Sequence, residues 1–254
     1  MRLWQARSFE RIEMANSPNR NDQRDDSRRQ TLRVMGIALA VIAVTLAGWW
    51  LFNGVLAPDP TPVAVDLTAE RPLAQLPPAQ RNGFYDAPPP LVIDTASSYE
   101  AVITMANGGE MRLRLFVEQS PMTVNNFVFL AQQGFFDGVT FHRVIDGFVA
   151  QGGDPAGNGR GGPGYQFADE VDNGLLFDRP GLVAMANSGP NTNGSQFFIT
   201  YAPLPSLNGG YSIFGELSAG QDTLDNLTRI EAGPFASEPV GDVIERITIE
   251  EIGD

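Results

Sequence analysis

Two stretches decide the fold of this chain: FHRVIDGFVAQGGD, residues 141–154, and MANSGPNTNGSQFFIT, residues 185–200. Both contain short runs of aromatic and aliphatic residues, which are typical of β-strands. Arginine, glutamine and asparagine side chains stand among these apolar residues, although such polar side chains are mostly exposed and charged ones are rarely fully buried unless they are paired. The two stretches are therefore the candidates for a functional site.

The sequence from Tyr99 onward has the pattern of a compact β-rich unit. Residues 99–116 predict a hairpin, because two strand-like runs flank the turn residues Asn-Gly-Gly at 107–109. Further short apolar stretches recur between glycine-rich turns along the rest of the chain. Many short strands with few helices predict a mainly β protein whose sheet closes into a barrel.

Two helices are expected within this unit. Ser120 is the predicted capping residue of the first helix, Pro121 its first helical residue and Gly134 its stop. The second helix is expected over residues 221–230 and is followed by a last strand over residues 245–252. Strands and helices do not alternate, so a doubly wound nucleotide-binding sheet is not expected.

An uninterrupted apolar run, VMGIALAVIAVTLAGWWLF, covers residues 34–52. A helix of this length, at 1.5 Å per residue, crosses the hydrocarbon layer of a bilayer, which is about 30 Å thick. Three arginines at positions 28–33 flank one end, and Trp49 and Trp50 lie at the other, as is typical of membrane interfaces. We expect one transmembrane helix that anchors the chain in the lipid bilayer; a buried core helix and a cleaved signal peptide are the alternatives.

The segments on either side of this run differ in charge. Eight of the 17 basic residues precede it and the next is Arg71, so the positive-inside rule predicts a cytoplasmic N-terminus and an extracytoplasmic domain. Residues 1–33 are polar and predict a disordered tail. Residues 53–98 contain nine of the 19 prolines and predict an extended tether, with the alternative that Phe84 and Tyr85 pack onto the domain.

Composition argues against several classes of function. Residues 53–254 carry nine arginines and 25 acidic residues, a net charge of −16, which repels nucleic acids. The chain has no cysteine and one histidine, so we expect no metal site and no cofactor. Glycines 157, 159 and 162 match GxGxxG by chance, because no helix follows them. There is no lysine for a phosphate-binding loop and no GxSxG motif of a serine hydrolase.

Residues 141–154 and 185–200 together closely resemble the signature segments of cyclophilin-type peptidyl-prolyl cis-trans isomerases, and the resemblance extends over residues 99–254. It implies a closed eight-stranded antiparallel barrel capped by two helices, with an active groove on its outer surface. It also implies that the partners are proline-containing polypeptides, whose X–Pro bonds would be rotated. The alternative is a tethered module that binds or chaperones proline-containing segments without turnover.

The same resemblance assigns roles to individual residues. The catalytic arginine of the family falls on Arg143. The positions that line the proline-binding pocket fall on Phe148, Val149, Phe198 and Leu207. The positions that contact the substrate backbone fall on Gln151, Ala186, Asn187 and Gln196.

Three positions depart from the family pattern. Val149 replaces the usual methionine and shortens one wall of the pocket. Ser206 and Tyr211 stand where tryptophan and histidine are frequent. In the family the tryptophan supports cyclosporin binding, so we expect weak inhibition by cyclosporin, while Tyr211 still offers the substrate an aromatic surface and a hydroxyl.

Some residues of the two stretches are expected to be structural. Strand alternation assigns Phe141 and Phe197 to the core, with Phe148 and Phe198 facing the groove. His142 is expected to be a hydrogen-bonded structural residue and not a catalyst.

Overall fold

The computed structural model describes residues 70–231 and 241–252. The expected tail, residues 1–33, and the expected transmembrane helix, residues 34–52, lie outside the described residues. Within the described residues, no helix is long enough and apolar enough to cross a membrane.

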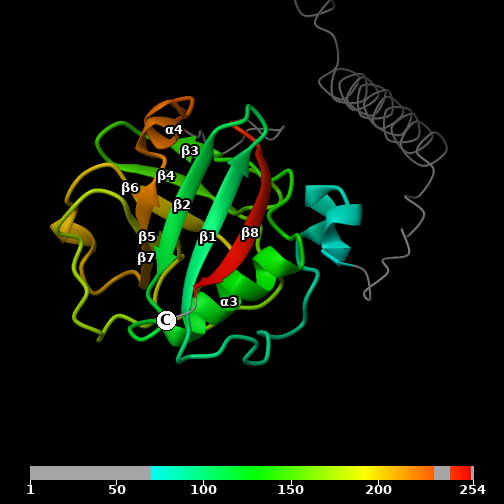
Figure 1. Cartoon of the computed structure of the whole chain (residues 1–254), viewed down its shortest axis with the longest axis horizontal. Helices are drawn as coiled ribbons and strands as arrows, with labels where there is room; N and C mark the ends of the chain where they lie inside the picture. The colour runs from blue at the N-terminus through cyan, green and yellow to red at the C-terminus, as the bar shows by residue number, and fades with distance from the viewer. Residues whose placement is uncertain (1–69, 232–240, 253–254) are drawn as a thin grey trace, which may run out of the picture. The chain divides into compact units, whose positions relative to one another are not determined.

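The centre of the structure is one curled sheet of eight antiparallel strands (Figure 1). The strands are β1 (Ser98–Met105), β2 (Glu110–Leu115), β3 (Arg143–Val144), β4 (Val149–Gly152), β5 (Leu182–Met185), β6 (Phe197–Thr200), β7 (Ile213–Ala219) and β8 (Ile244–Ile252). Their order across the sheet is β3-β4-β6-β5-β7-β2-β1-β8. The prediction of a mainly β protein with eight antiparallel strands is confirmed.

The sheet has two end strands, β3 and β8, and the chain that precedes each of them brings the ends together. The amide of Phe141 donates to the carbonyl of Asp242 at 3.0 Å, and the amide of Ile244 donates to the carbonyl of Val139 at 2.8 Å. These contacts are short bridges and not a continuous ladder of hydrogen bonds. The sheet is therefore a curled half-barrel, and the closed barrel that we expected is interrupted at this seam.

The first hairpin is built as the sequence predicts. In β2, Met111, Leu113 and Leu115 are buried, while Arg112 and Arg114 point away from the core. This alternation follows from the two-residue period of a strand with one face in the core. The hairpin prediction is confirmed.

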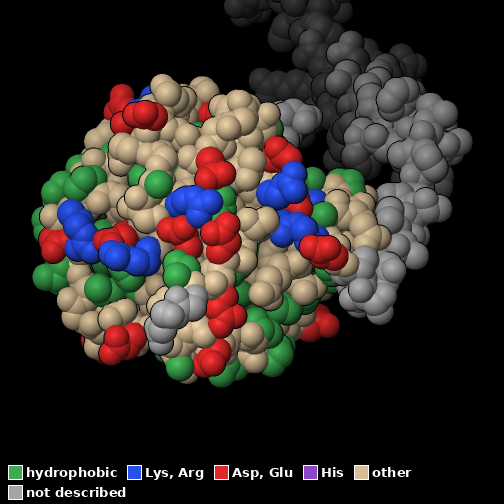
Figure 2. Space-filling model, in the orientation of Figure 1, with side chains coloured by type: hydrophobic (Ala, Val, Ile, Leu, Met, Phe, Trp, Pro, Cys, Tyr) green, Lys and Arg blue, Asp and Glu red, His purple; other side chains and the backbone are tan. Residues whose placement is uncertain are grey.

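The outer face of β1, β2 and β8 carries arginines among carboxylates (Figure 2). Arg112 lies at the centre and forms ion pairs with Glu100 at 2.8 Å, Glu110 at 3.0 Å and Glu250 at 3.0 Å. The one guanidinium therefore partly balances the negative charge of three carboxylates on this face. Exposed pairs of this kind typically contribute at most about 1 kcal/mol each.

The main core is dominated by phenylalanine side chains. Phe127, Phe136, Phe197 and Phe214 are fully buried, and their ring centroids lie between 5.1 and 5.8 Å apart in neighbouring pairs. Burying each ring contributes roughly 1.5–3 kcal/mol relative to exposing it. The core joins the inner face of the sheet to helix α3 (Pro121–Gln132).

Helix α3 is capped by a residue that the sequence did not indicate. Ser120 occupies the N-cap position, as predicted, but its side chain makes no cap hydrogen bond and instead donates to the carbonyl of Ile213 at 2.6 Å. The Glu170 carboxylate accepts hydrogen bonds from the amides of Met122 at 3.0 Å and Thr123 at 2.8 Å. A carboxylate at this end also interacts favourably with the helix dipole.

The second helix, α4 (Gln221–Asp225), is shorter than the predicted range 221–230. The residues after it pair with β3 instead, because the amide of Val144 donates to the carbonyl of Ile230 and the reciprocal bond is also made, both at 2.8 Å. Pairing with the sheet thus outcompetes continued helix formation. The prediction of two helices is confirmed, and the length of the second was wrong.

The described part of the expected tether lies against the domain. It forms two short 3-10 helices, η1 (Pro72–Gln75) and η2 (Pro78–Arg81). Leu73 is fully buried in the main core, and Phe84 and Tyr85 pack against that core. These residues therefore follow the alternative in which Phe84 and Tyr85 pack onto the domain.

Replacing the distant cap of α3 should destabilise the protein. We expect Glu170→Ala to lower the free energy of unfolding by about 1 kcal/mol, because two amides at the helix N-terminus lose their acceptor. Urea denaturation followed by circular dichroism measures the change. Asp172→Ala, an exposed neighbour, is the matched control and should leave stability unchanged; equal stability of the two variants would contradict the capping role.

Candidate active site

The site is built on three adjacent strands, β3, β4 and β6. Arg143 of β3 lies directly opposite Gln151 of β4, and Gln151 lies directly opposite Phe198 of β6. Residues directly opposite each other in antiparallel strands share one face of the sheet. The register alone therefore brings together three of the predicted site residues.

A chain of side-chain hydrogen bonds runs away from Arg143 across these strands. The guanidinium donates to Gln151 Oε1 at 3.4 Å, Gln151 Nε2 donates to Gln196 Oε1 at 2.9 Å, and Gln196 Nε2 donates to the carbonyl of Gly161 at 2.9 Å. The Arg143 guanidinium also lies 5.4 Å from the centre of the Phe148 ring. The arginine is thus held from two sides, by an amide and by an aromatic ring.

The apolar site residues form a cluster that is separate from the main core. Its buried members are Val149, Phe177, Leu182, Ala184, Phe198 and Ile213, and its partly exposed members include Phe148, Ala186, Leu207 and Tyr211. A cluster that is partly open to solvent, on the face that carries Arg143, can bind an apolar ring.

The assignment of four phenylalanines to core or groove follows strand alternation. Phe141 and Phe197 are fully buried in the main core, whereas Phe198 belongs to the outer cluster and Phe148 is only half-buried beside it. The predicted core positions of Phe141 and Phe197 are confirmed.

Three residues are expected at the rim of the site: Asn187, Ser206 and Tyr211. The Asn187 side-chain amide donates to the carbonyl of Gly210 at 2.8 Å, which fixes its orientation. Tyr211 packs edge-on against Phe198 with 5.5 Å between ring centroids. Ser206 is exposed in the short helix η3 (Pro205–Leu207), so this part of the rim lacks a large side chain.

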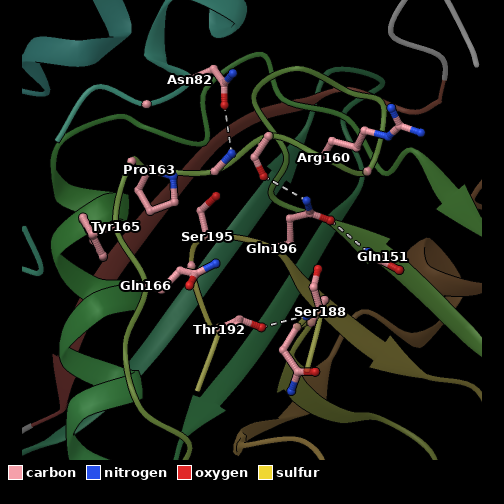
Figure 3. A pocket seen from close by; sticks show the side chains of 18 residues that line it. Asn82, Gln151, Arg160, Pro163, Tyr165, Gln166, Ser188, Thr192, Ser195 and Gln196 are labelled. Carbon is pink, nitrogen blue, oxygen red and sulfur yellow. Dashed lines mark hydrogen bonds between the residues drawn. The ribbon is translucent and has the colours of Figure 1, made fainter. Parts of the chain in front are cut away.

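A polar cavity of about 670 Å³ adjoins the apolar cluster (Figure 3). Four predicted substrate-contacting residues, Gln151, Ala186, Asn187 and Gln196, line the cavity, and Ala186 also packs against the apolar cluster. The remaining lining is mostly amide, hydroxyl and backbone groups from residues 159–166 and 188–195. An extended polypeptide seated on the cluster can therefore continue into this cavity.

His142 lies in the interior and not in the groove. It is 1% exposed, and neither ring nitrogen has a hydrogen-bond partner among the residues that the structure describes. The expectation of a structural histidine agrees with this burial; within the described part of the chain neither ring nitrogen makes a hydrogen bond of ordinary length and angle, although the backbone of Thr140 interacts with the ring. Burial lowers the pKa of His142 below its ordinary value, and the nearby Asp154 carboxylate opposes this effect.

Sequence reasoning missed two kinds of residue at the site. Asp154 is buried and accepts amide hydrogen bonds from Ala156, Asn158, Gly159 and Arg160, which shapes the loop beside the cavity. An aspartate followed by a glycine-rich stretch is a known signal of such a turn. Phe177, which stacks on Phe198 at 5.9 Å, follows a glycine-containing loop and gave no comparable signal.

An antiparallel half-barrel with an arginine beside an external apolar groove defines a class of peptide-binding protein, and comparison with known proteins identifies the family. The model of the cyclophilin-type peptidyl-prolyl cis-trans isomerase/CLD family matches residues 101–253. Peptidyl-prolyl cis-trans isomerase B of Streptomyces anulatus is 46% identical over 162 residues, which cover 57% of this chain and 93% of the relative.

Two further comparisons agree. Peptidyl-prolyl cis-trans isomerase A of Mycobacterium tuberculosis is 48% identical over 162 residues, covering 56% of this chain and 88% of the relative. The crystal structure of a Cryptosporidium parvum cyclophilin, in the presence of the dipeptide Ala-Pro, matches with a TM-score of 0.53 and 40% identity, covering 59% of this chain and 98% of that one. The chain belongs to the cyclophilin family, and its activity is peptidyl-prolyl cis-trans isomerisation.

The buried His142 should make stability depend on pH. Its folded-state pKa is lowered, so the unfolded chain, with a pKa of about 6.5, binds the proton more readily. The free energy of unfolding should therefore fall as pH drops through and below this value. Because this is the only histidine, its imidazole resonances can be followed by NMR without assignment. A folded-state pKa at or above 6.5, or an unchanged pH dependence in His142→Gln, would contradict this expectation.

Proposed function

We propose that Arg143 is the catalytic residue of this isomerase. Rotation about an X–Pro bond breaks amide conjugation, which costs about 18–20 kcal/mol, and it requires no covalent intermediate. As the bond twists, the prolyl nitrogen regains its lone pair. A fixed guanidinium that donates to this nitrogen, or to the adjacent carbonyl oxygen, stabilises the twisted state more than the planar one.

The surroundings of Arg143 suit this role. Its guanidinium is charged at all physiological pH values, so catalysis does not depend on a titrating group. The contact with Gln151 and the Phe148 ring restrict its orientation while leaving other N–H groups for the substrate. Restricting the donor before the substrate arrives reduces the cost of reorganisation in the transition state.

The apolar cluster would hold the proline ring. We infer that Phe148, Val149, Phe198 and Leu207 bind the ring, with Tyr211 closing one side through its contact with Phe198. The substrate-backbone contacts would come from Gln151, Ala186, Asn187 and Gln196, which line the polar cavity, with Ala186 also packed against this cluster. One end of the rotating bond is then fixed while the other turns.

The observation that carries this proposal is the register that sets Arg143 opposite Gln151 and Gln151 opposite Phe198. A surface that only bound proline-containing segments would need the apolar cluster but not an oriented guanidinium beside it. This argument favours turnover over the alternative of a non-catalytic binding module.

Removing the guanidinium should abolish most of the activity. We expect Arg143→Ala in the full-length chain to lower kcat/KM for a short X–Pro peptide by roughly 10²–10³-fold, as for loss of one electrostatic donor to a transition state. The loss should fall on kcat more than on KM, because the interaction is made mainly in the transition state. A protease-free isomerisation assay by NMR exchange measures both constants.

Two variants serve as controls. Arg143→Lys keeps a positive charge but not the planar fork, and should recover only part of the activity. Arg246→Ala, in β8 and exposed, should leave the activity unchanged. Full activity of Arg143→Ala, with circular dichroism like that of the native chain, would reject Arg143 as the catalytic residue.

We further propose that this isomerase acts outside the cytoplasm on polypeptides that pass near a membrane. The apolar run 34–52, with three arginines at 28–33 before it, supports a single transmembrane anchor with a cytoplasmic N-terminus. Residues 53–69 would then connect the anchor to the domain. Clients would be proline-containing chains at the outer face of that membrane.

The chain has no cysteine, which makes its topology easy to test. Single variants Ser17→Cys and Pro60→Cys lie on opposite sides of the apolar run. In spheroplasts, a membrane-impermeant maleimide should label Pro60→Cys only, and detergent should expose Ser17→Cys. Labelling of Ser17→Cys without detergent would overturn the orientation, and a mature chain lacking residue 17 by mass would indicate a cleaved signal peptide.

A further inference from the structure

Residues 71–85 precede β1, and we call them the strap. The strap contacts the loop of residues 159–166, which lines the polar cavity. The amide of Gly83 donates to the carbonyl of Gly162 at 2.9 Å, and the amide of Gly162 donates to Asn82 Oδ1 at 3.0 Å. The amide of Tyr85 donates to the carbonyl of Pro163 at 2.8 Å. Three hydrogen bonds therefore join the strap to this loop, and Figure 3 shows Asn82 above the cavity.

The strap and the loop approach each other too closely for a side chain at one point. A Cβ atom at Gly164 would lie 2.1 Å from the carbonyl oxygen of Tyr85 and 2.9 Å from the carbonyl carbon of Gly83. Gly164 also has φ +111°, a conformation that other residues rarely adopt. The loop is thus shaped for the strap to lie on it.

The strap is held to the domain by two arginines. Arg71 pairs with Asp137 at 2.5 Å, and the buried Arg81 donates to the carbonyls of Gly134 and Phe135, both at 3.0 Å. Burial lowers the pKa of Arg81 to about 10, so the guanidinium remains charged at neutral pH. A buried charge is tolerated only where its donors are satisfied, and these carbonyls satisfy them.

The strap is connected to Arg143, the proposed catalytic residue, indirectly through the loop of residues 159–166. Asn82 and Gly83 line the same cavity as Gln151 and Gln196. The carbonyl of Gly161, next to the residue that Asn82 holds, accepts the hydrogen bond from Gln196, which in turn accepts one from Gln151. The strap therefore fixes the far end of the hydrogen-bond chain that begins at Arg143.

We propose that the strap is a working part of the substrate site, with Asn82 as a positioning residue for the loop that forms the cavity wall. This inference rests on the proposed groove around Arg143. The ligand would be the polar residues that flank an X–Pro bond in an extended polypeptide, because amide, hydroxyl and backbone groups make up most of the cavity lining. The strap precedes residues 101–253, so it adds to the part of the chain that the family model matches.

The experiment compares two substrates on the full-length chain. One is a blocked four-residue X–Pro peptide that ends near the groove; the other has the same centre with four polar residues on each side. Asn82→Ala should lower kcat/KM for the long peptide by roughly three- to tenfold, mainly through KM, and change the short peptide by less than about twofold. Asn82→Asp, which keeps the Oδ acceptor, should restore the native value.

Gln80→Ala, an exposed position in the same strap, is the matched control and should equal the native chain with both peptides. Equal loss on both peptides, or no loss on the long one, would overturn the proposal. If the native chain turned over neither peptide, the proposed active groove would fail instead. Binding of the long peptide, followed by amide chemical shifts, would then decide: a weaker affinity in Asn82→Ala would support the strap, and an unchanged affinity would reject it.

Discussion

In paired strands a slip of one residue moves every side chain to the opposite face. The site depends on one such pairing, in which Arg143, Gln151 and Phe198 lie opposite one another across β3, β4 and β6. The same register turns Ala150 and Ile199 into the main core. Core packing therefore fixes the groove, because any slip that moved Arg143 would also bring polar groups into the interior at a cost of several kcal/mol.

The division of aromatic residues into two clusters follows from this constraint. Phe197 packs in the main core, and its neighbour Phe198 packs in the outer cluster with Phe177 and Tyr211. Rings fully enclosed in the core contribute stability, whereas Phe148 and Tyr211 of the outer cluster keep part of their surface open for a ligand. A surface of this kind costs some stability but requires little rearrangement when a proline ring binds.

Local sequence signals predicted the local parts of the structure. The hairpin, helix α3 and the core positions of Phe141 and Phe197 follow from turn residues and from the periods of helix and strand. The roles of Arg143 and its neighbours came from the resemblance, since an arginine in a strand does not by itself indicate catalysis. The contacts that could not be predicted join residues far apart in the sequence. Glu170 caps a helix 48 residues earlier, and Asn82 accepts a hydrogen bond from the amide of Gly162, 80 residues later. Such contacts form only in the completed fold. At Ile230, pairing with Val144 of β3 replaces the helix that the local sequence predicted.

The attachment of the strap has a mechanical consequence. A pulling force on the chain ahead of residue 71 would first load the Arg71–Asp137 pair and the bonds from Arg81 to Gly134 and Phe135. These acceptors lie just after α3, so tension would enter the molecule at the end of a helix and not through β3, β4 or β6. The strands that carry Arg143 are therefore not the first elements to receive tension from the leading chain.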